Sequence, residues 1–232
     1  MSPYRKIVVL TGAGISAESG INTFRASDGL WENHRVEDVA TPEGFVADPA
    51  LVHRFYNERR VAANAALPNS AHAALAKFEA AFSGNFLLVT QNVDTLHERA
   101  GSQSLIHIHG QLDQMKCASC DQYWQHEGDS FVDDHCPQCQ EKSTRPDIVW
   151  FGEMPYQMEA IWEALDECDL FVSIGTSGAV YPAAGFAQIA ARKGAQCVEL
   201  NLEPSQNARD FTDGHYGPAS EIVPTFFGDL LR

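Results

Sequence analysis

The sequence predicts an α/β fold with a parallel β-sheet and a small inserted lobe held by a metal ion. Three observations support this prediction. An apolar run at residues 7–10 leads directly into Gly12-Ala13-Gly14, later apolar runs alternate with helical segments and end in small polar residues, and two Cys-x-x-Cys pairs lie between them. Strands that alternate with helices are typical of parallel sheets, and paired cysteine motifs are typical of zinc sites.

The composition limits the possible functions. With 232 residues, of which 44% are hydrophobic, the chain can bury a full core as one domain with a small insert. The formal net charge of -15 argues against nonspecific binding to nucleic acid or anionic lipid, and it is compatible with basic protein partners. No apolar run approaches the roughly 20 residues of a membrane span, so we expect a soluble cytoplasmic protein.

The segment at residues 6–25, KIVVLTGAGISAESGINTFR, organises the rest of the chain. Its strand breaks at Gly12 and Gly14, where glycine lets the backbone turn sharply and approach a ligand. The N–H groups of such a loop suit an anion such as a dinucleotide pyrophosphate. The third glycine of a GxGxxG motif is missing, because Ala17 stands in its place. From two glycines alone, an ordinary strand-to-helix turn is as well supported as nucleotide binding.

Residues 26–45 are too irregular for one helix or strand and predict a long loop, either functional or connecting. Helical periodicity returns over residues 49–66. After Pro68 it resumes over residues 71–82, where Asn69 or Ser70 can cap the helix. A buried strand follows at residues 86–89.

Polar side chains follow this strand. Gln91, Asn92 and Asp94 are expected at the carboxyl edge of the sheet, where ligands of parallel sheets bind. Amides and a carboxylate there can bind an amide ligand or ribose hydroxyls, but the same residue types are common in turns and caps. Both interpretations stay open on this motif alone.

Two histidines lie in the alternating run LIHIHG at residues 105–110. If the run is extended, His107 and His109 share a face, and either can serve as a general base or a metal ligand. A core histidine satisfied by a hydrogen bond is the alternative, and for a single histidine it is the more common case.

Four cysteines give the strongest physical signal: Cys117, Cys120, Cys136 and Cys139, with 15 residues between the pairs. Four thiolates close a tetrahedral shell around zinc, so the ion stabilises a lobe and performs no chemistry. The polar segment between the pairs cannot form a core by itself. His126 and His135 are weaker alternative ligands, whereas Cys168 and Cys197 lie in apolar, strand-like runs.

Strands and helices alternate to the end of the chain. We expect a helix over residues 157–167, a strand over 170–174, a helix over 183–193, a strand over 197–200 and a short apolar C-terminal helix. The two strands end in Gly175-Thr176-Ser177 and Asn201-Leu202-Glu203. Small polar residues at several strand ends predict a cofactor-binding edge of the sheet.

The motifs GAGISAESGINTFR, QNVD, HIHG, the two CxxC pairs, RPDIVWFGE, GTS and NLE, in this order, make the chain resemble the sirtuins, which are NAD-dependent protein-lysine deacylases. The resemblance covers essentially the whole chain, and the segment FYNERR makes it similar to the bacterial class III subgroup. One departure is Asn22-Thr23, where many sirtuins have proline first.

The resemblance implies a single catalytic unit with a Rossmann-like parallel sheet and a small inserted zinc-binding lobe. The large lobe is expected at about residues 1–30, 70–110 and 153–232. The small lobe is expected at about residues 31–69, its helical part, and 111–152, its zinc module.

The resemblance also implies a set of residues that bind NAD, which is consumed as a co-substrate. In the glycine-rich loop and the segment after it, they are Gly12, Ala13, Gly14, Ser16, Glu18, Phe24, Arg25 and Trp31. On the nicotinamide and ribose side they are Gln91, Asn92, Val93 and Asp94. On the adenosine side they are Gly175, Thr176, Ser177, Asn201, Leu202, Glu203 and Ala219. The cysteines hold one structural Zn2+.

The implied reaction begins when the acyl-lysine carbonyl oxygen attacks C1′ of the nicotinamide ribose and nicotinamide leaves. His109 matches the general base because it immediately precedes glycine, and His107 does not match. Asn92 and Asp94 complete the catalytic set, since a carboxylate favours the positive charge that develops at C1′. The products are free lysine, nicotinamide and 2′-O-acyl-ADP-ribose.

The class III motif implies the removal of succinyl and malonyl as well as acetyl groups. Tyr56 and Arg59 are three apart on a helix, so they share a face and can converge on a substrate carboxylate. Ala40 leaves room for a longer acyl group, and Arg60 should point away and tolerate substitution. Without the resemblance, a solvated helix surface is the better interpretation of FYNERR.

Two other functions fit parts of the pattern. Mono-ADP-ribosyl transfer shares the loss of nicotinamide, and a zinc-ribbon binding protein with a vestigial nucleotide fold needs no catalysis. His109, Asn92 and Asp94 together argue against the vestigial protein. The expected partners are acyl-lysine proteins or peptides, without specific nucleic acid or membrane, and a monomer is expected.

Overall fold

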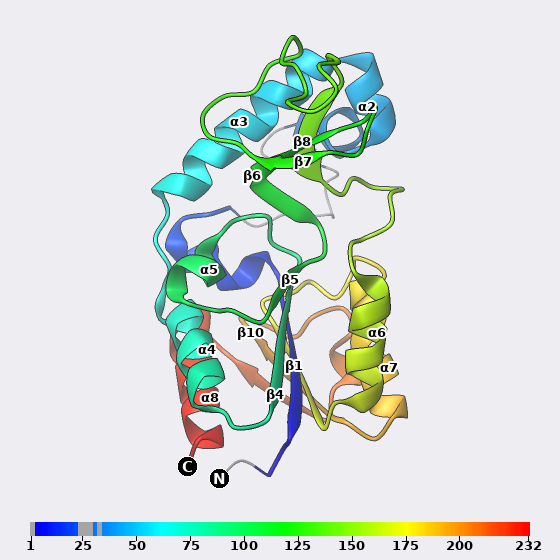
Figure 1. Ribbon diagram of the computed structural model, residues 1–232. Helices are drawn as coiled ribbons and strands as arrows, with labels where there is room; N and C mark the ends of the chain where they lie inside the picture. The colour runs from blue at the N-terminus through cyan, green and yellow to red at the C-terminus, as the bar shows by residue number, and fades with distance from the viewer. Residues whose placement is uncertain (1–2, 23–29, 32–33) are drawn as a thin grey trace.

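The structure is a computed structural model that describes residues 3–22, 30–31 and 34–232. A larger lobe contains the main sheet, and a smaller lobe lies above it in the view of Figure 1. Phe24 and Arg25, which the sequence assigns to the cofactor, lie outside the described residues.

The main sheet has six strands, all parallel, in the order β11, β10, β9, β1, β4, β5. Their bounds are β1 Lys6–Thr11, β4 Asn85–Thr90, β5 Leu105–His107, β9 Leu170–Ile174, β10 Gln196–Asn201 and β11 Asp213–Tyr216. From β1 the chain adds β4 and β5 on one side, and later β9, β10 and β11 on the other. The strand order therefore reverses between β1 and β9, and open parallel sheets bind ligands at the carboxyl ends of their strands at such a point.

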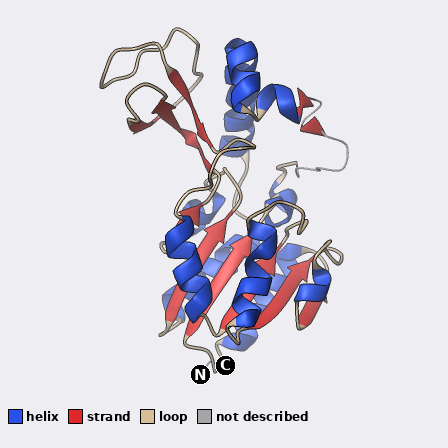
Figure 2. Ribbon diagram, turned by 90° about the vertical axis from the view of Figure 1, so that its right-hand side faces the viewer, coloured by secondary structure: helices blue, strands red, loops and turns tan. Residues whose placement is uncertain are grey.

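Helices cover both faces of this sheet (Figures 1 and 2). On one face lie α4, Ser70–Ala81, and α8, Ala219–Leu230, and on the other lie α6, Met158–Glu167, and α7, Phe186–Arg192. Successive residues of a strand point to opposite faces, so Val9 packs in the core beneath α4 and α8, whereas Val8 packs beneath α6 and α7. The predicted α/β fold with a parallel sheet is confirmed.

The first turns of α4 and α8 support each other. The side chain of Asn69 caps α4, and His72 Nδ1 accepts from the Asn69 N–H. Pro224 lies inside α8 and has no N–H for the carbonyl of Ser220, four residues earlier. Ser70 Oγ donates to that carbonyl at 2.7 Å. The start of α4 thus satisfies the acceptor that the proline leaves unpaired in α8.

The small lobe combines a helical segment with a three-stranded sheet. The segment contains the strands β2 Leu30–Trp31 and β3 His34–Arg35 and the helices α1 Val36–Val39, α2 Pro42–Ala47 and α3 Pro49–Ala65. The antiparallel sheet has the order β7 Tyr123–Gln125, β6 Gly110–Cys117 and β8 Thr144–Ile148. Phe55, Tyr56 and Trp150 belong to the core shared by the two parts.

Several short elements differ from the sequence predictions. The region predicted as irregular contains β2, β3, α1 and most of α2 in its described part, and β11 and α5, Leu96–Ala100, were not predicted. Elements of two to six residues carry little periodicity, so packing defines them. The condition that residues 105–110 are extended is met only as far as His107, because β5 ends there and His109 lies in a turn.

Short 3-10 helices complete the fold: η1 Ala13–Ile15, η2 Ala17–Ser19, η4 Ala183–Gly185 and η5 Ala208–Asp210. Among the helices of the described ranges, none has the length and apolar character that a membrane crossing requires.

Candidate functional site

A pocket of about 260 Å³ opens at the carboxyl ends of β1, β4 and β9, where the strand order reverses and the small lobe meets the large one. Its lining comes from both lobes and comprises Gly12, Ala13, Ser16, Ile21, Asn22, Trp31, Ala40, Tyr56, Gln91, Asn92, Val93, Asp94, His109, Ile148, Val149, Trp150, Phe151, Gly152, Glu153, Pro155, Thr176, Ser177, Val180 and Tyr181. Motifs that are far apart in the sequence therefore share one cavity.

The glycine-rich loop lies against the loop that follows β9. Gly14 N donates to Gly175 O at 2.8 Å, and a Cβ on Gly14 would lie only 2.7 Å from Gly175 Cα. A side chain there would push the two loops apart, so this close approach requires glycine. Ala17 begins η2 and is not among the described residues with positive φ, which explains why no third glycine is needed.

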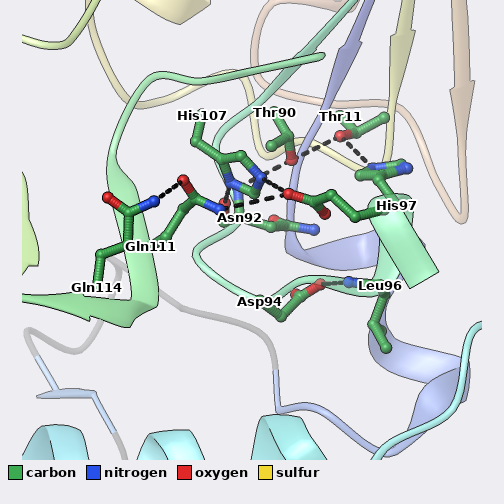
Figure 3. Close-up of polar contacts among 10 residues, drawn as sticks. Thr11, Thr90, Asn92, Asp94, Leu96, His97, His107, Gln111 and Gln114 are labelled. Atoms are coloured by element: carbon green, nitrogen blue, oxygen red, sulfur yellow. Dashed lines mark hydrogen bonds and ion pairs between the residues drawn. The ribbon is translucent and has the colours of Figure 1, made fainter. Parts of the chain in front are cut away.

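Asn92 and Asp94 are buried and fixed by hydrogen bonds. Asn92 Nδ2 donates to Gly12 O at 3.2 Å and to Ser16 Oγ at 3.1 Å. Asp94 Oδ2 accepts from Ser16 Oγ at 3.2 Å, and its Oδ1 accepts from Leu96 N at 3.1 Å (Figure 3). Burial raises the pKa of Asp94 above its ordinary value, and the hydrogen bonds to the carboxylate oppose that shift. The amide and the carboxylate are thus held in place before any ligand binds.

His72 joins this network, although sequence reasoning missed it. Its Nε2 lies 3.5 Å from Ser16 Oγ, and its Nδ1 accepts from the Asn69 N–H, so Nε2 carries the hydrogen. Burial lowers the pKa of His72 to about 4, which keeps the ring neutral. The only sequence signal is a histidine in the first turn of a capped helix. Other pocket residues that were missed, such as Tyr181 and Val180, carry no motif signal.

His109 lies in the turn between β5 and β6 and lines the pocket. Its Nδ1 is 3.1 Å from the carbonyl oxygen of Gln91, so Nδ1 carries the hydrogen and Nε2 keeps its lone pair in the neutral ring. Burial lowers the pKa of His109 below its ordinary value, against the effect of this hydrogen bond. Gly110 follows with a φ of +82°, and a Cβ there would clash with Asp147 O. The turn therefore presents a neutral imidazole that is suited to accepting a proton.

Tyr56 and Ala40 line the small-lobe end of the pocket. Tyr56 is fully buried, and its hydroxyl oxygen accepts from Trp150 Nε1 at 3.1 Å. Burial raises the pKa of Tyr56, so the phenol stays protonated. Within the described ranges no residue accepts the hydroxyl hydrogen of Tyr56, which leaves it available to a ligand.

Arg59 is not among the residues that line the pocket, but its charge acts on Tyr56, which does line it. Its guanidinium carbon is 4.3 Å from the centre of the Phe55 ring, and Nη2 is 3.4 Å from Glu58 Oε2. Arg59 Nη1 is buried and has no hydrogen-bond partner among the residues that the structure describes. A buried donor without a partner is unusual and is suited to an anionic ligand.

The expectation that Arg60 tolerates substitution is wrong. Arg60 does point away from the pocket, but it is buried and donates to three acceptors: Leu112 O, Asn57 Oδ1 and Gly128 O. Removing the guanidinium would leave these buried acceptors unpaired, which costs stability.

Of the residues assigned to the adenosine side, two line the pocket. Thr176 and Ser177 line it, and Asn201 Nδ2 donates to Thr176 O at 2.8 Å. Leu202 and Glu203 follow on the exposed surface.

The structure places Glu18 at the start of α8. Its carboxylate accepts from Ser220 N at 2.8 Å and from Ser220 Oγ at 2.6 Å, next to Ala219. Glu18 therefore connects the glycine-rich loop to the C-terminal helix and does not line the pocket.

The four cysteines converge at one end of the small lobe. The distance between the sulfurs is 3.7 Å for Cys117 and Cys139 and 3.7 Å for Cys120 and Cys136, and all four sulfurs lie within 4.8 Å of one another. Zinc with four bonds of about 2.3 Å separates its sulfur ligands by roughly 3.8 Å. The cluster therefore fits a structural zinc ion, and His126 is not part of the ligand group found in the described part of the chain.

Replacing Cys117 with alanine is expected to lower the thermal stability and the zinc content together, because three thiolates rarely hold a structural ion. Metal analysis and thermal unfolding of the variant check this expectation. The matched control is Cys197→Ala, since Cys197 is buried beside α7 and lies outside the cluster. Retention of one zinc ion per chain at native affinity in the Cys117 variant would contradict the four-cysteine assignment.

The comparisons with known proteins cover both lobes. The family model described as Sir2 family matches residues 12–182. The NAD-dependent protein deacylase of Pasteurella multocida is 57% identical over 234 residues, which cover 100% of each chain. The NAD-dependent protein deacylase of Salmonella typhimurium is 56% identical over 230 residues, which cover 98% of this chain and 84% of the relative.

Solved structures of Sir2 homologues are also similar to this chain over nearly its whole length. A Sir2 homologue in complex with NAD is 36% identical and superposes with a TM-score of 0.90, covering 98% of this chain and 90% of that chain. A mutant Sir2 homologue in complex with ADP ribose is also 36% identical and has a TM-score of 0.91, with 98% and 92% coverage.

Proposed function

The chain belongs to the Sir2 family, and on that premise we propose that it is an NAD-dependent protein-lysine deacylase that removes succinyl and malonyl groups as well as acetyl groups. The observation that carries the proposal is the meeting of two kinds of group in one pocket. Asn92, Asp94 and a neutral His109 line its large-lobe side, and Tyr56, whose hydroxyl hydrogen has no acceptor in the described ranges, lines its small-lobe side.

The large-lobe side suits NAD as a substrate. The glycine-rich loop and the loop after β9 meet where the strand order reverses, which is the usual position for a dinucleotide. Asn92 and Asp94 supply an amide and a carboxylate that suit the nicotinamide and its ribose, and the negative charge of Asp94 favours the positive charge that develops at C1′ when nicotinamide leaves. His109 accepts the proton of a ribose hydroxyl at Nε2, the nitrogen that its bond to Gln91 leaves open.

The small-lobe side suits an acyl group that ends in a carboxylate. The Tyr56 hydroxyl can donate to one carboxylate oxygen, and Arg59, one turn further along α3, has a buried Nη1 without a partner in the described ranges. Ala40 is buried at this end of the pocket, and its methyl side chain leaves space that a larger residue would fill. Succinyl and malonyl groups present such a carboxylate, and an acetyl group presents only a methyl.

Mass spectrometry of NAD incubated with acetyl-lysine, succinyl-lysine and malonyl-lysine peptides tests this function. We expect free nicotinamide, the deacylated peptide and 2′-O-acyl-ADP-ribose with each peptide. The unmodified lysine peptide is the control and should release no nicotinamide above background. Transfer of ADP-ribose to the peptide, or nicotinamide release that does not depend on an acyl group, would refute the proposal.

A further inference from the structure

His107 lies at the end of β5, and its ring contacts the backbone of the segment that carries Asn92 and Asp94 (Figure 3). Its Nδ1 is 2.9 Å from the carbonyl oxygen of Asn92, and its Nε2 is 2.6 Å from Glu98 Oε1. The imidazole is buried, with only 8% of its side chain exposed. His107 is not among the residues that line the pocket, so it has no direct contact with a ligand there.

The hydrogen-bond partners of its two nitrogens determine the charge of the His107 ring. A carbonyl oxygen only accepts, so Nδ1 of His107 must carry a hydrogen. The neutral ring has no second hydrogen, yet Nε2 faces a carboxylate oxygen at 2.6 Å, and a proton must lie between these two atoms. Imidazole holds a proton about two pKa units more tightly than a glutamate carboxyl, so the proton belongs to His107. The pair is an imidazolium ion with a carboxylate, and the short distance suits a charge-assisted bond.

The two histidines of the HIHG motif therefore donate to the carbonyl oxygens of two consecutive residues, but they differ in charge: His109 is neutral and His107 is a cation. His109 donates to Gln91 O and keeps an open Nε2 in the pocket, whereas His107 donates to Asn92 O and to Glu98. Glu98 Oε1 also accepts from Gln111 Nε2 at 3.4 Å, and Gln111 Oε1 accepts from Gln114 Nε2 at 3.0 Å (Figure 3). This chain of hydrogen bonds runs from the segment after β4 to β6 of the small lobe.

We propose that His107 is a positioning residue which, as an imidazolium ion, ties the carbonyl of Asn92 to Glu98 and favours the anionic form of Asp94 at the pocket. This inference rests on the proposed function for its catalytic consequence, and on hydrogen-bond geometry alone for the charge of His107. It gives the first histidine of the motif a role that differs from that of the second.

The electrostatic surroundings support the cation. Burial lowers the pKa of His107, but the hydrogen bond and the charge of Glu98, together with the Asn92 carbonyl and Asp94, outweigh it and raise this pKa above its ordinary value. Burial raises the pKa of Asp94, and the charge of His107 counteracts that rise. The titratable groups near His107 on its neighbouring elements are Glu98 and His97 of α5, Asp94, and Asp113 of β6. Tyr123, Asp147 and Tyr156 line an adjoining hollow together with His107.

The first test is a titration of histidine ring resonances by NMR in the wild-type protein, with His107→Gln and His109→Gln used only to assign the signals. We expect His107 to stay protonated above pH 6.5, the ordinary value of histidine, and His109 to lose its proton below it. A neutral His107 at pH 6.5 would overturn the proposal. This measurement needs no turnover, so it decides the charge of His107 even if the deacylase function fails.

The second test compares the pH dependence of nicotinamide exchange in wild type, His107→Gln and His215→Gln. Glutamine keeps a donor but no charge, and without the cation the pKa of Asp94 rises. The acid limb of the profile should therefore move to higher pH in the His107 variant. His215 is the matched control, because it also lies near a carboxylate, 3.4 Å from Asp213, but on β11 at the opposite edge of the sheet. An unchanged acid limb in the His107 variant would show a merely structural role.

Discussion

Replacing His109 with alanine is expected to reduce deacylation by about 10²- to 10⁴-fold, the usual contribution of a positioned general base. The ring is neutral because its Nδ1 donates to Gln91 and burial lowers its pKa, so Nε2 is ready to accept a proton. Rates with a succinyl-lysine peptide and saturating NAD measure the loss. Nicotinamide exchange should persist in the variant, since nicotinamide departs before the proposed proton transfer.

The His109 variant should keep its fold and its affinity for NAD. Calorimetric NAD binding and thermal unfolding provide these controls, and His215→Ala is a matched variant at an exposed histidine that does not line the pocket. If His109→Ala loses NAD binding as completely as deacylation, the residue binds the substrate, and its role as a base must be given up.

Replacing Arg59 with methionine is expected to lower kcat/KM for succinyl-lysine peptides by roughly 30-fold or more. This factor corresponds to a loss of about 2 kcal/mol of transition-state stabilisation. Arg59 Nη1 is buried without a partner in the described part of the chain, and a substrate carboxylate would supply one. Activity on acetyl-lysine peptides should change little, because a methyl group offers no acceptor. The ratio of the two specificity constants is therefore the quantity to measure.

Arg60 is unsuitable as the control for this experiment, because its three buried hydrogen bonds make it structural. Arg54 is suitable, since it lies on the same helix and is exposed, and Arg54→Met should leave both activities unchanged. Equal losses on succinyl and acetyl substrates in the Arg59 variant would mean that Arg59 stabilises the lobe and does not recognise the carboxylate.

The sequence predicted the parts of the molecule that depend on local pattern. The buried strand β1 has a continuous apolar run at residues 7–10, and the glycine-rich loop follows it as expected. The predicted α/β fold is confirmed by the sheet, and the predicted NAD and structural zinc are confirmed by the family and by the four-cysteine cluster. The roles of the individual site residues remain predictions.

Features that depend on distant contacts could not be read from the sequence. The strand β11 has the polar sequence DGHY and exists because β10 pairs with it at the edge of the sheet. Arg60 is an ordinary charged helix residue in the sequence, and only the packing of α3 against β6 buries it. His72 gains its place beside Ser16 in the same way, through the docking of α4 against the glycine-rich loop.

The contact between Gly14 and Gly175 has a consequence for how the protein can change over evolution. Backbone meets backbone at this position, so neither glycine can be replaced by a residue with a side chain without separating the two loops. The opposite end is built from the side chains of Ala40, Tyr56 and Trp150. Point mutations in the small lobe can therefore reshape that end of the pocket, whereas Gly14 and Gly175 must both be retained for the two loops to meet.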